Sequence, residues 1–393
     1  MQSFIYQSPT EVVFGKDSEN QTAHKVKAYG GSRVLIVFGG GSVVKSGLLN
    51  RIEESFTAAG IAFASIGGVQ PNPRLSWVRN GIEKSLDFGA DFILAIGGGS
   101  VIDSAKAIAH GSANPETNVW SFWTGEEVIK KSLPVGAVLT IAAAGSETSD
   151  SAVLTNEETQ TKRGLSAEIN RPKFAIMNPE LTCTLPYYQV ACGIVDIMMH
   201  TLDRYFTPTD GNELTDEIAE ALLRVTIRNG VIAMKDKTDY QAMSELMWCG
   251  SLSHNGLTGL GAVRDFAPHK LGHELSARFD VAHGASLSAI WGSWATYVYH
   301  QKIERFVHFA DKVWGIRKEN DEAAACAGIA ATVAYFASLG MPTCFSELGI
   351  GVQSEDVIHD LANRTVSYGQ PKIGGFRLLG GEDTYTIYQM ANR

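Results

Sequence analysis

The spacing of apolar residues changes character near the middle of the chain. Before residue 185, short runs rich in β-branched residues alternate with stretches whose apolar positions recur at helical spacing. This alternation is typical of a parallel sheet covered by helices. The predicted strands are Glu11–Phe14, Arg33–Phe38, Ala62–Ile66, Phe92–Ile96, Val135–Thr140 and Phe174–Met177, and the predicted helices between them include Leu48–Ala59 and Leu75–Phe88.

From Leu185 onward the apolar pattern is helical only. The predicted helices of this part include Tyr187–Tyr205, Glu213–Met234, Tyr240–His254 and Ala323–Leu339. A chain of 393 residues is long enough for two domains, because a single core stops growing at roughly 250–300 residues. We therefore predict an α/β domain over residues 1–184 and an all-helical domain over residues 185–393.

Composition narrows the class of partner. Hydrophobic residues make up 45% of the chain and charged residues 19%, which excludes a disordered protein. The longest apolar stretches are shorter than the roughly 20 residues of a membrane span. A net charge of −9 without runs of Lys or Arg argues against nucleic acid or an anionic membrane as the main partner. A small molecule is the predicted partner.

Cysteine usage and the first residues bear on the compartment. The five cysteines are scattered and never form a Cys-x-x-Cys pair, so reduced thiols are expected rather than disulfides or a thiolate zinc site. The first residues lack the basic and apolar regions of a signal peptide. We expect a cytoplasmic protein.

A glycine turn follows the predicted strand Phe92–Ile96. The turn Gly97-Gly98-Gly99-Ser100 leads directly into a helix-like stretch. Glycines allow backbone N–H groups to approach a phosphate closely, and the N-terminus of the next helix adds partial positive charge. The pattern is not G-x-G-x-x-G, and a plain tight turn between strand and helix remains the alternative.

Two further loops bear on the cofactor. Gly39–Ser42 follows the strand Arg33–Phe38 and offers small residues and a hydroxyl, with Lys45 three residues further on. An acidic residue after an early strand would favour NAD by binding the ribose hydroxyls. Its absence predicts NADP(H), although turn glycines alone would look the same. The hydroxyl-rich loop Thr140–Ser149 either lines the same groove or caps a helix.

Five ionisable side chains in the second half have the spacing of metal ligands. Asp196 and His200 stand four residues apart, as do His269 and His273, and His283 follows. A four-residue separation puts two side chains on one face of a helix. One carboxylate with two or three imidazoles suits iron(II) or zinc. Chance pairing among the 10 histidines is the alternative, but buried ionisable groups of this kind are costly unless they are satisfied.

Together these motifs resemble the iron-containing, or group III, alcohol dehydrogenases, and within them the NADPH-dependent butanol dehydrogenase and aldehyde reductase branch. The resemblance covers nearly the whole chain. It implies a Rossmann-like dinucleotide-binding domain followed by an all-helical metal-binding and catalytic domain, a plan shared with dehydroquinate synthase. It also implies hydride transfer between NADP(H) and a primary alcohol or aldehyde, with a divalent iron or zinc ion, in a homodimer.

The resemblance assigns roles to individual positions. Asp196, His200, His269 and His283 match the metal ligands, whereas His273 matches a histidine near the nicotinamide and is the expected proton relay. Because Pro268 precedes His269, we expect His269 to lie near the start of a helix. The cofactor-binding positions are Gly39, Gly40, Gly41, Ser42, Gly97, Gly98, Gly99, Ser100, Asp103, Thr140 and Lys162. For Lys162 a solvated surface lysine is the alternative.

Two other enzyme classes remain open. An NAD-dependent polyol dehydrogenase fits less well because of its cofactor and ligand pattern. A lyase resembling dehydroquinate synthase would need clustered basic residues for its substrate, and the metal motifs are flanked only by Arg204, Arg264, Lys270 and Arg278. Aromatic candidates for a substrate pocket, each of them equally compatible with ordinary packing, are Trp123, Trp248, Trp291 and Phe266.

Overall fold

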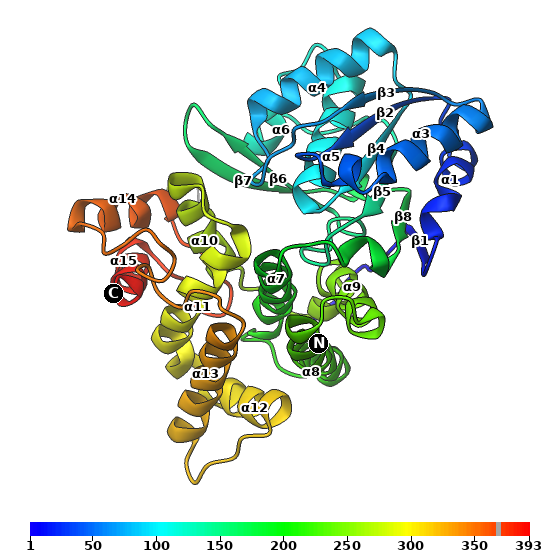
Figure 1. Cartoon of the computed structure of the whole chain (residues 1–393). Coiled ribbons are helices and arrows are strands. Elements are labelled where there is room, and N and C mark those ends of the chain that lie inside the picture. The colour runs from blue at the N-terminus through cyan, green and yellow to red at the C-terminus, as the bar shows by residue number, and fades with distance from the viewer. Residues whose placement is uncertain (367–370) are drawn as a thin grey trace. The chain divides into compact units, whose positions relative to one another are not determined.

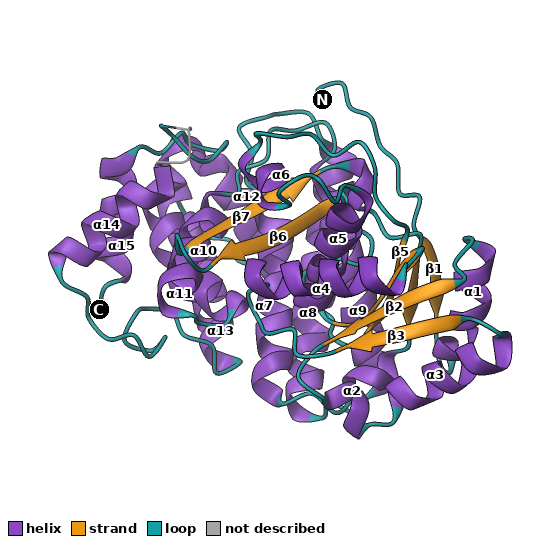
Figure 2. Cartoon of the chain, turned by 90° about the horizontal axis from the view of Figure 1, so that it is seen from above, coloured by secondary structure: helices purple, strands orange, loops and turns teal. Residues whose placement is uncertain are grey.

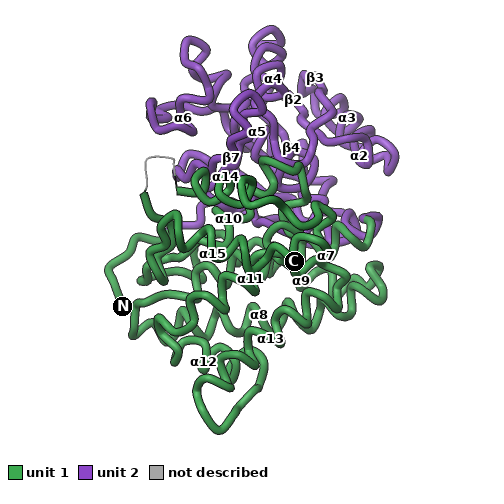
Figure 3. The backbone as a smooth tube through the Cα atoms, turned by 90° about the vertical axis from the view of Figure 1, so that its left-hand side faces the viewer, with its two compact units in different colours: residues 1–6, 186–393 green, residues 7–185 purple. Residues whose placement is uncertain are grey.

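A six-stranded parallel sheet occupies the first half of the chain, and helices make up the second half (Figure 1). The computed structural model describes residues 1–366 and 371–393. The chain divides into two units, shown in different colours in Figure 3. Gln7–Leu185 forms the α/β unit, and Met1–Tyr6 together with Pro186–Arg393 forms the helical unit.

The sheet of the α/β unit has the strand order β1-β8-β5-β4-β2-β3, and all of its pairings are parallel. Its strands are β1 (Glu11–Phe14), β2 (Arg33–Phe38), β3 (Ala62–Ile66), β4 (Phe92–Gly97), β5 (Val135–Leu139) and β8 (Phe174–Met177). Every residue of β4 is buried, as expected for a central strand covered on both faces. All six predicted strands are confirmed to within a residue at each end.

The helices of the α/β unit connect and flank these strands. They are α1 (Thr22–Ala28), α2 (Ser42–Lys45), α3 (Leu48–Ala59), α4 (Leu75–Phe88), α5 (Gly99–Ala113) and α6 (Trp120–Thr124), with short 3₁₀ turns at Ser18–Gln21, Glu168–Asn170 and Pro179–Thr182. The two predicted helices, Leu48–Ala59 and Leu75–Phe88, have the predicted bounds. Both end at a glycine in the left-handed region, Gly60 and Gly89, which is the usual residue for a helix C-terminus.

One element of this unit was not predicted. β6 (Ser151–Asn156) and β7 (Thr161–Ser166) form an antiparallel hairpin apart from the main sheet (Figure 2). The sequence of β7, Thr-Lys-Arg-Gly-Leu-Ser, lacks the apolar alternation that identifies a strand. Its partner strand and the loops around it stabilise the extended conformation, so local sequence alone does not reveal it.

The helical unit consists of helices and short 3₁₀ turns, with no strand among its described residues. The helices are α7 (Tyr187–Tyr205), α8 (Glu213–Lys235), α9 (Tyr240–His254), α10 (Ala267–Phe279), α11 (His283–Val298), α12 (Ile303–Trp314), α13 (Asp321–Ser338), α14 (Glu355–Val366) and α15 (Gly381–Ala391), and the 3₁₀ turns are Leu257–Gly259 and Tyr299–Lys302. The predicted helices are confirmed, with ends that shift by two residues at most. The expected fold class, a Rossmann-like domain plus an all-helical domain, is therefore confirmed.

Aromatic side chains fill part of the core of the helical unit. Phe206 stacks on Phe306 with ring centroids 4.3 Å apart, and its ring also contacts those of Trp291 and Trp294. Trp291 is fully buried in this cluster. The structure therefore supports the alternative of ordinary packing for Trp291, because its indole is fully buried against the rings of Phe206, Trp294, Phe309 and Phe336.

Helix α7 is buried over nearly its whole length, from Val190 to Tyr205. A helix that is buried all round must satisfy every polar side chain that it carries.

No helix among the described residues is long and apolar enough to cross a membrane. All five cysteines are free thiols.

Candidate functional site

Helix α7 supplies a carboxylate and an imidazole to one buried point of the helical unit. Asp196 and His200 lie one turn apart on the same face, and both are about 5% exposed. The Nε2 atom of His200 lies 3.4 Å from Oδ1 of Asp196. Burial, together with neighbouring histidines, holds the pKa of His200 well below its usual range. The imidazole is therefore neutral, which is the form that binds a metal ion.

Helix α10 brings His269 to the same carboxylate. Pro268 lies in the first turn of α10, where its missing N–H is not needed, so His269 lies near the helix start as expected. His269 Nε2 lies 4.0 Å from Asp196 Oδ1. Its other nitrogen, Nδ1, is 2.5 Å from Oδ2 of Asp203, a fully buried carboxylate on α7. A carboxylate that accepts the Nδ1 proton fixes the ring with its Nε2 lone pair free for a metal.

Helix α11 contributes the third imidazole. His283 is its first residue, and Nε2 of His283 lies 3.8 Å from Asp196 Oδ1. The next residue has to be glycine, because a Cβ on Gly284 would lie 2.3 Å from the carbonyl oxygen of Cys192 on α7. This close approach of the two helices places His283 beside Asp196. With a quarter of its side chain exposed, His283 is the most accessible of the four residues.

These residues fit a divalent transition-metal ion. Ligand atoms bound to zinc at about 2.0–2.2 Å in a tetrahedral arrangement lie about 3.4 Å apart. The three Nε2 atoms lie 3.4, 3.8 and 4.0 Å from Asp196 Oδ1, close to that separation. The Nε2 atom of His269 is buried and has no hydrogen-bond partner in the described part of the chain. A metal ion satisfies this nitrogen and the convergent donors together.

His273 lies beside this cluster. It is one turn after His269 on α10, with its ring centroid 5.3 Å from that of His283 and 6.3 Å from that of His269. The group of potential ligand atoms that lie within 4.8 Å of one another comprises Asp196, His200 and His269, and it includes neither His273 nor His283. His283 joins the proposed ligands through the 3.8 Å between its Nε2 and Asp196 Oδ1. The location of His273 agrees with a residue that is near the metal centre without being one of its ligands.

Sequence reasoning missed two residues of this site. Asp203 follows Asp196 by seven residues, which is two helical turns on the same face, so the spacing contained a signal that could have found it. His254, the last residue of α9, stacks on His200 with ring centroids 3.9 Å apart. No local pattern links a helix end at residue 254 to α7, and only the tertiary packing brings the two together.

In the α/β unit, both predicted glycine turns lie where a parallel sheet usually binds ligands. The strand β2 pairs with β3 on one side and with β4 on the other, so the chain order of the sheet reverses between β2 and β4. Ligands of such sheets bind outside the carboxyl ends of the strands at this reversal. Gly39–Ser42 leaves the end of β2, and Gly97–Ser100 joins the end of β4 to helix α5.

The loop after β5 packs against the second of these turns. The N–H of Thr140 donates to the carbonyl of Gly97 at 3.1 Å. A Cβ on Gly98 would lie 2.9 Å from the Ile141 side chain, whereas a Cβ on Gly99 would meet nothing closer than 3.6 Å. Gly98 is therefore required by packing within the protein. Gly99 is not, so its lack of a side chain leaves room for a ligand.

Asp103 and Lys106 on α5 hold the next part of that loop. Asp103 accepts hydrogen bonds from the Ser146 hydroxyl at 2.6 Å and from the Val153 N–H at 2.8 Å. Lys106 is fully buried, and its Nζ donates to four oxygens of Ser146, Ser149 and Ser151. Burial lowers the pKa of Lys106 to about 8. Asp103 is thus directed at this loop, and Lys106 is a second anchor that sequence reasoning missed.

Lys162 is not a solvated surface lysine. Lys162 is only 6% exposed, and its Nζ donates to Oδ1 of Asn72 at 2.9 Å. Asn72 itself is buried and lies in the left-handed region with φ of 57°, which is uncommon for a residue other than glycine. The positive charge of Lys162 also acts on Asp103, so these predicted cofactor residues lie near each other.

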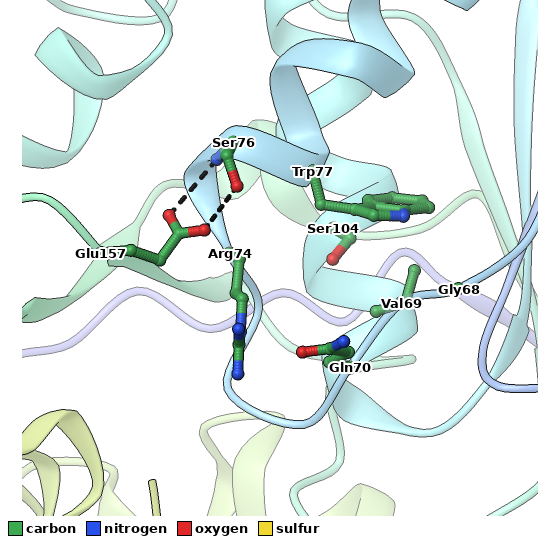
Figure 4. A pocket seen from close by; sticks show the side chains of 8 residues that line it. All are labelled: Gly68, Val69, Gln70, Arg74, Ser76, Trp77, Ser104 and Glu157. Carbon is green, nitrogen blue, oxygen red and sulfur yellow. Dashed lines mark hydrogen bonds between the residues drawn. The ribbon is translucent and has the colours of Figure 1, made fainter. Parts of the chain in front are cut away.

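A small cavity of about 190 Å³ in the α/β unit lies beside the turn after β2, since its lining residue Gly68 donates from its N–H to the carbonyl of Gly39 at 3.1 Å (Figure 4). Glu157 closes one wall by accepting hydrogen bonds from the hydroxyl and the N–H of Ser76 at the start of α4. This carboxylate occupies the helix N-terminus and disfavours a phosphate. The cavity is also smaller than the roughly 300–1,000 Å³ of typical ligand sites. Its lining residues are Gly68, Val69, Gln70, Arg74, Ser76, Trp77, Ser104 and Glu157.

Of the aromatic candidates, Phe266 contacts the rings of two proposed ligands, His269 and His200. Its ring centroid is 5.4 Å from that of His269. Trp123 is buried and donates from Nε1 to the carbonyl of Ala152, which is a structural role. Trp248 lies on α9 and is 42% exposed.

The helical unit thus offers a candidate metal centre of one carboxylate and three imidazoles, and the α/β unit offers glycine turns at the reversal of a parallel sheet. Both features belong to a metal- and nicotinamide-dependent oxidoreductase, and comparison with known proteins agrees. A profile of the iron-containing alcohol dehydrogenases matches residues 9–179, and a profile of the C-terminal part of the Fe-containing alcohol dehydrogenase family matches residues 190–391. The chain therefore belongs to the iron-containing alcohol dehydrogenase family.

Individual relatives cover the chain from end to end. It is 40% identical over 391 residues to the NADH-dependent butanol dehydrogenase A of Clostridium acetobutylicum, which covers 99% of both chains. It is 34% identical over 397 residues to the NADPH-dependent aldehyde reductase YqhD of Escherichia coli K12, with 100% of both chains covered. The crystal structure of an NADH-dependent butanol dehydrogenase A from Thermotoga maritima matches with a TM-score of 0.96 and 33% identity over 100% of this chain and 99% of that one. The chain is thus an oxidoreductase of alcohols and aldehydes.

Proposed function

We propose that this enzyme reduces short-chain aldehydes with NADPH, and oxidises the corresponding primary alcohols, at one divalent iron or zinc ion held by Asp196, His200, His269 and His283. The observation that carries the proposal is the approach of three imidazole Nε2 atoms to one carboxylate oxygen, at 3.4 to 4.0 Å. One acidic and three neutral ligands suit either ion.

The bound ion supplies Lewis-acid polarisation of the substrate carbonyl, and the nicotinamide supplies the hydride. The protein's part is to hold and orient. Asp196 contributes the only negative charge of the ligand set. A divalent ion held there would therefore keep a net charge of +1, which would stabilise negative charge developing on the substrate oxygen. Asp203 fixes the ring of His269 through its Nδ1 proton.

His273 is the proposed source of the proton that the alcohol product requires. It lies beside His283, the most exposed of the proposed ligands, and it is itself half-buried. Among the side chains, imidazole is the one whose unperturbed pKa, roughly 6.5, suits proton exchange near neutral pH. In reduction, an N–H of the protonated ring donates to the substrate oxygen, and the ring takes its proton back from water.

The preference for NADPH rests on the loop after β2. Gly39–Ser42 contains no carboxylate, and the nearest charged residue along the loop is Lys45. A carboxylate there would repel the 2′-phosphate of NADPH. The relatives divide on this point, since the butanol dehydrogenases are described as NADH-dependent and the aldehyde reductase as NADPH-dependent. The proposed cofactor contacts are the two glycine turns with Ser100, Asp103, Thr140 and Lys162.

The remaining parts of the proposal rest on the family resemblance. We infer a homodimer in the cytoplasm, and light scattering on the purified protein tests the dimer.

Reconstitution tests the function itself. Protein stripped of metal by a chelator is reloaded with iron(II) under anaerobic conditions, or with zinc, and oxidation of NADPH by butanal is followed by absorbance. We expect the stripped protein to be inactive and at least one of the two ions to restore turnover. If no divalent ion restores NADPH-dependent or NADH-dependent reduction of any short aldehyde, the proposal is wrong.

A further inference from the structure

His254 is an additional imidazole at the proposed metal centre. It is the last residue of α9, and its ring lies against that of His200 with centroids 3.9 Å apart and planes 24° from parallel. The two rings are close to parallel, and their centroids are closer together than the roughly 4.5–7 Å that is usual for aromatic pairs. The ring of His254 therefore constrains the plane in which the His200 ring can lie.

The ring of His269, another proposed ligand, is oriented in a different way. His269 is fixed by a hydrogen bond from its Nδ1 to Asp203. Metal-binding histidines almost always make such a bond with their second nitrogen. In His200 the corresponding atom, Nδ1, is buried and has no hydrogen-bond partner in the described part of the chain. Ring stacking takes the place of the missing hydrogen bond.

The backbone that carries His254 is itself firmly held. At the end of α9 the N–H of Asn255 donates to the carbonyl of Ser251, and the Asn255 side chain accepts from the N–H of Leu257 at 3.0 Å. The 3₁₀ turn that follows packs on α7, because a Cβ on Gly259 would lie 3.0 Å from the Arg204 side chain. Arg204 is one turn beyond His200 on α7 and donates to its carbonyl oxygen at 2.6 Å. The stacking ring is therefore anchored to the helix that carries its partner.

We propose that His254 is a positioning residue for the metal centre, which fixes the plane of the His200 imidazole by stacking and thereby increases the affinity for the divalent ion. This inference rests on the proposed function, in which His200 is a ligand. It assigns the effect to the aromatic face of His254 and not to its nitrogens. An aromatic ring without nitrogen should then replace it.

Metal affinity gives a direct test that is independent of turnover. The dissociation constant for zinc is measured by competition with a chromophoric chelator for the full-length protein and for the variants His254→Leu and His254→Phe. We expect His254→Leu to bind zinc about tenfold more weakly, the lower end of the range for losing an outer partner of a ligand. His254→Phe should bind within about threefold of the unchanged protein, because the stacking face is retained.

A matched control comes from the same unit. His359 on α14 stacks on Tyr385 at 4.2 Å and 20°, an arrangement similar to that of His254, but its partner is not a proposed ligand. His359→Leu should leave zinc affinity unchanged. If His254→Leu does not fold, as judged by circular dichroism, His254→Gln replaces it with the same expected loss.

The outcomes separate the two proposals. If the wild-type protein binds zinc and the dissociation constant of His254→Leu lies within twofold of the wild-type value, His254 does not position His200. If His254→Phe is as weak as His254→Leu, a nitrogen of His254 is responsible and the stacking inference is overturned. If the unchanged protein itself binds neither zinc nor iron(II), the proposed function has failed.

Discussion

The hydrogen bond between Asp203 and His269 offers a sharp test of how the metal centre is built. Replacing Asp203 by asparagine keeps the size of the side chain but removes its charge. The amide can also turn its NH₂ group toward His269, which favours the wrong imidazole tautomer and places a proton on the Nε2 atom that should bind the ion. We therefore expect Asp203→Asn to weaken metal binding.

The size of the effect follows from burial. Asp203 is fully buried, so solvent does not screen its interaction with the Nδ1 proton of His269. Hydrogen bonds to charged groups contribute about 1.5–3 kcal/mol. At 1.4 kcal/mol for each factor of ten, this corresponds to roughly a 10- to 100-fold increase in the metal dissociation constant. That range agrees with the usual cost of removing an outer partner of a metal ligand.

Stability of the metal-free protein distinguishes this effect from general damage. Asp265 is buried near Asp203, and burial together with the charge of Asp203 raises the pKa of Asp265 to about 7. Removing the charge of Asp203 relieves this repulsion, which offsets the weakened bond to His269. We expect the metal-free variant to unfold within about 1 kcal/mol of the unchanged protein in a denaturant titration. A metal dissociation constant within twofold of the original would refute the reasoning.

Four further changes test other parts of the account. His273→Ala should reduce kcat by at least about 100-fold, the lower end of the contribution from general acid–base catalysis, with one metal ion per chain retained; loss of the metal would make His273 a ligand. Gly39→Asp should lower kcat/KM for NADPH by at least about tenfold relative to NADH, whereas the uncharged control Gly39→Asn should not. A Cβ at this position lies no closer than 3.6 Å to its neighbours, so both side chains fit. Equal losses in the two variants would contradict the argument from charge. Gly99→Ala has a similarly open Cβ position and should leave the melting temperature unchanged while weakening cofactor binding about tenfold; unchanged binding would mean that no ligand approaches this backbone. Burial lowers the pKa of Lys106 in the folded protein to about 8, from its usual 10.5. Between these pH values the unfolded chain binds one proton more than the folded protein, so the free energy of unfolding should rise with pH, by up to about 3 kcal/mol relative to Lys106→Met. If denaturation measurements from pH 8 to 10 show a constant difference between the two proteins, Lys106 titrates normally.

Local sequence was sufficient for much of the fold. The strands of the main sheet and the helices Leu48–Ala59, Leu75–Phe88 and Tyr187–Tyr205 were predicted almost to the residue, because their apolar positions repeat clearly and glycine or proline marks several of their ends. The hairpin of β6 and β7 was missed, since β7 is mostly polar and depends on its partner strand.

The site divides in the same way. The pair Asp196 and His200 was visible because a helix converts a four-residue spacing into one face. His254 and the anchor Lys106 were not visible, because their partners lie on other elements and only the folded packing brings them together. Lys162 was predicted as a cofactor contact, with a solvated surface lysine as the alternative, and it is buried against Asn72. Contacts between distant segments carry no periodic signal along the chain.

Anomalous diffraction from crystals of the metal-loaded protein tests the assignment of the four proposed ligands directly. Data collected at the absorption edge of the loaded ion should show one strong peak per chain, about 2.0–2.2 Å from Oδ1 of Asp196 and from Nε2 of His200, His269 and His283. A peak bound instead through His254 or His273, or no peak in this part of the helical unit, would contradict it.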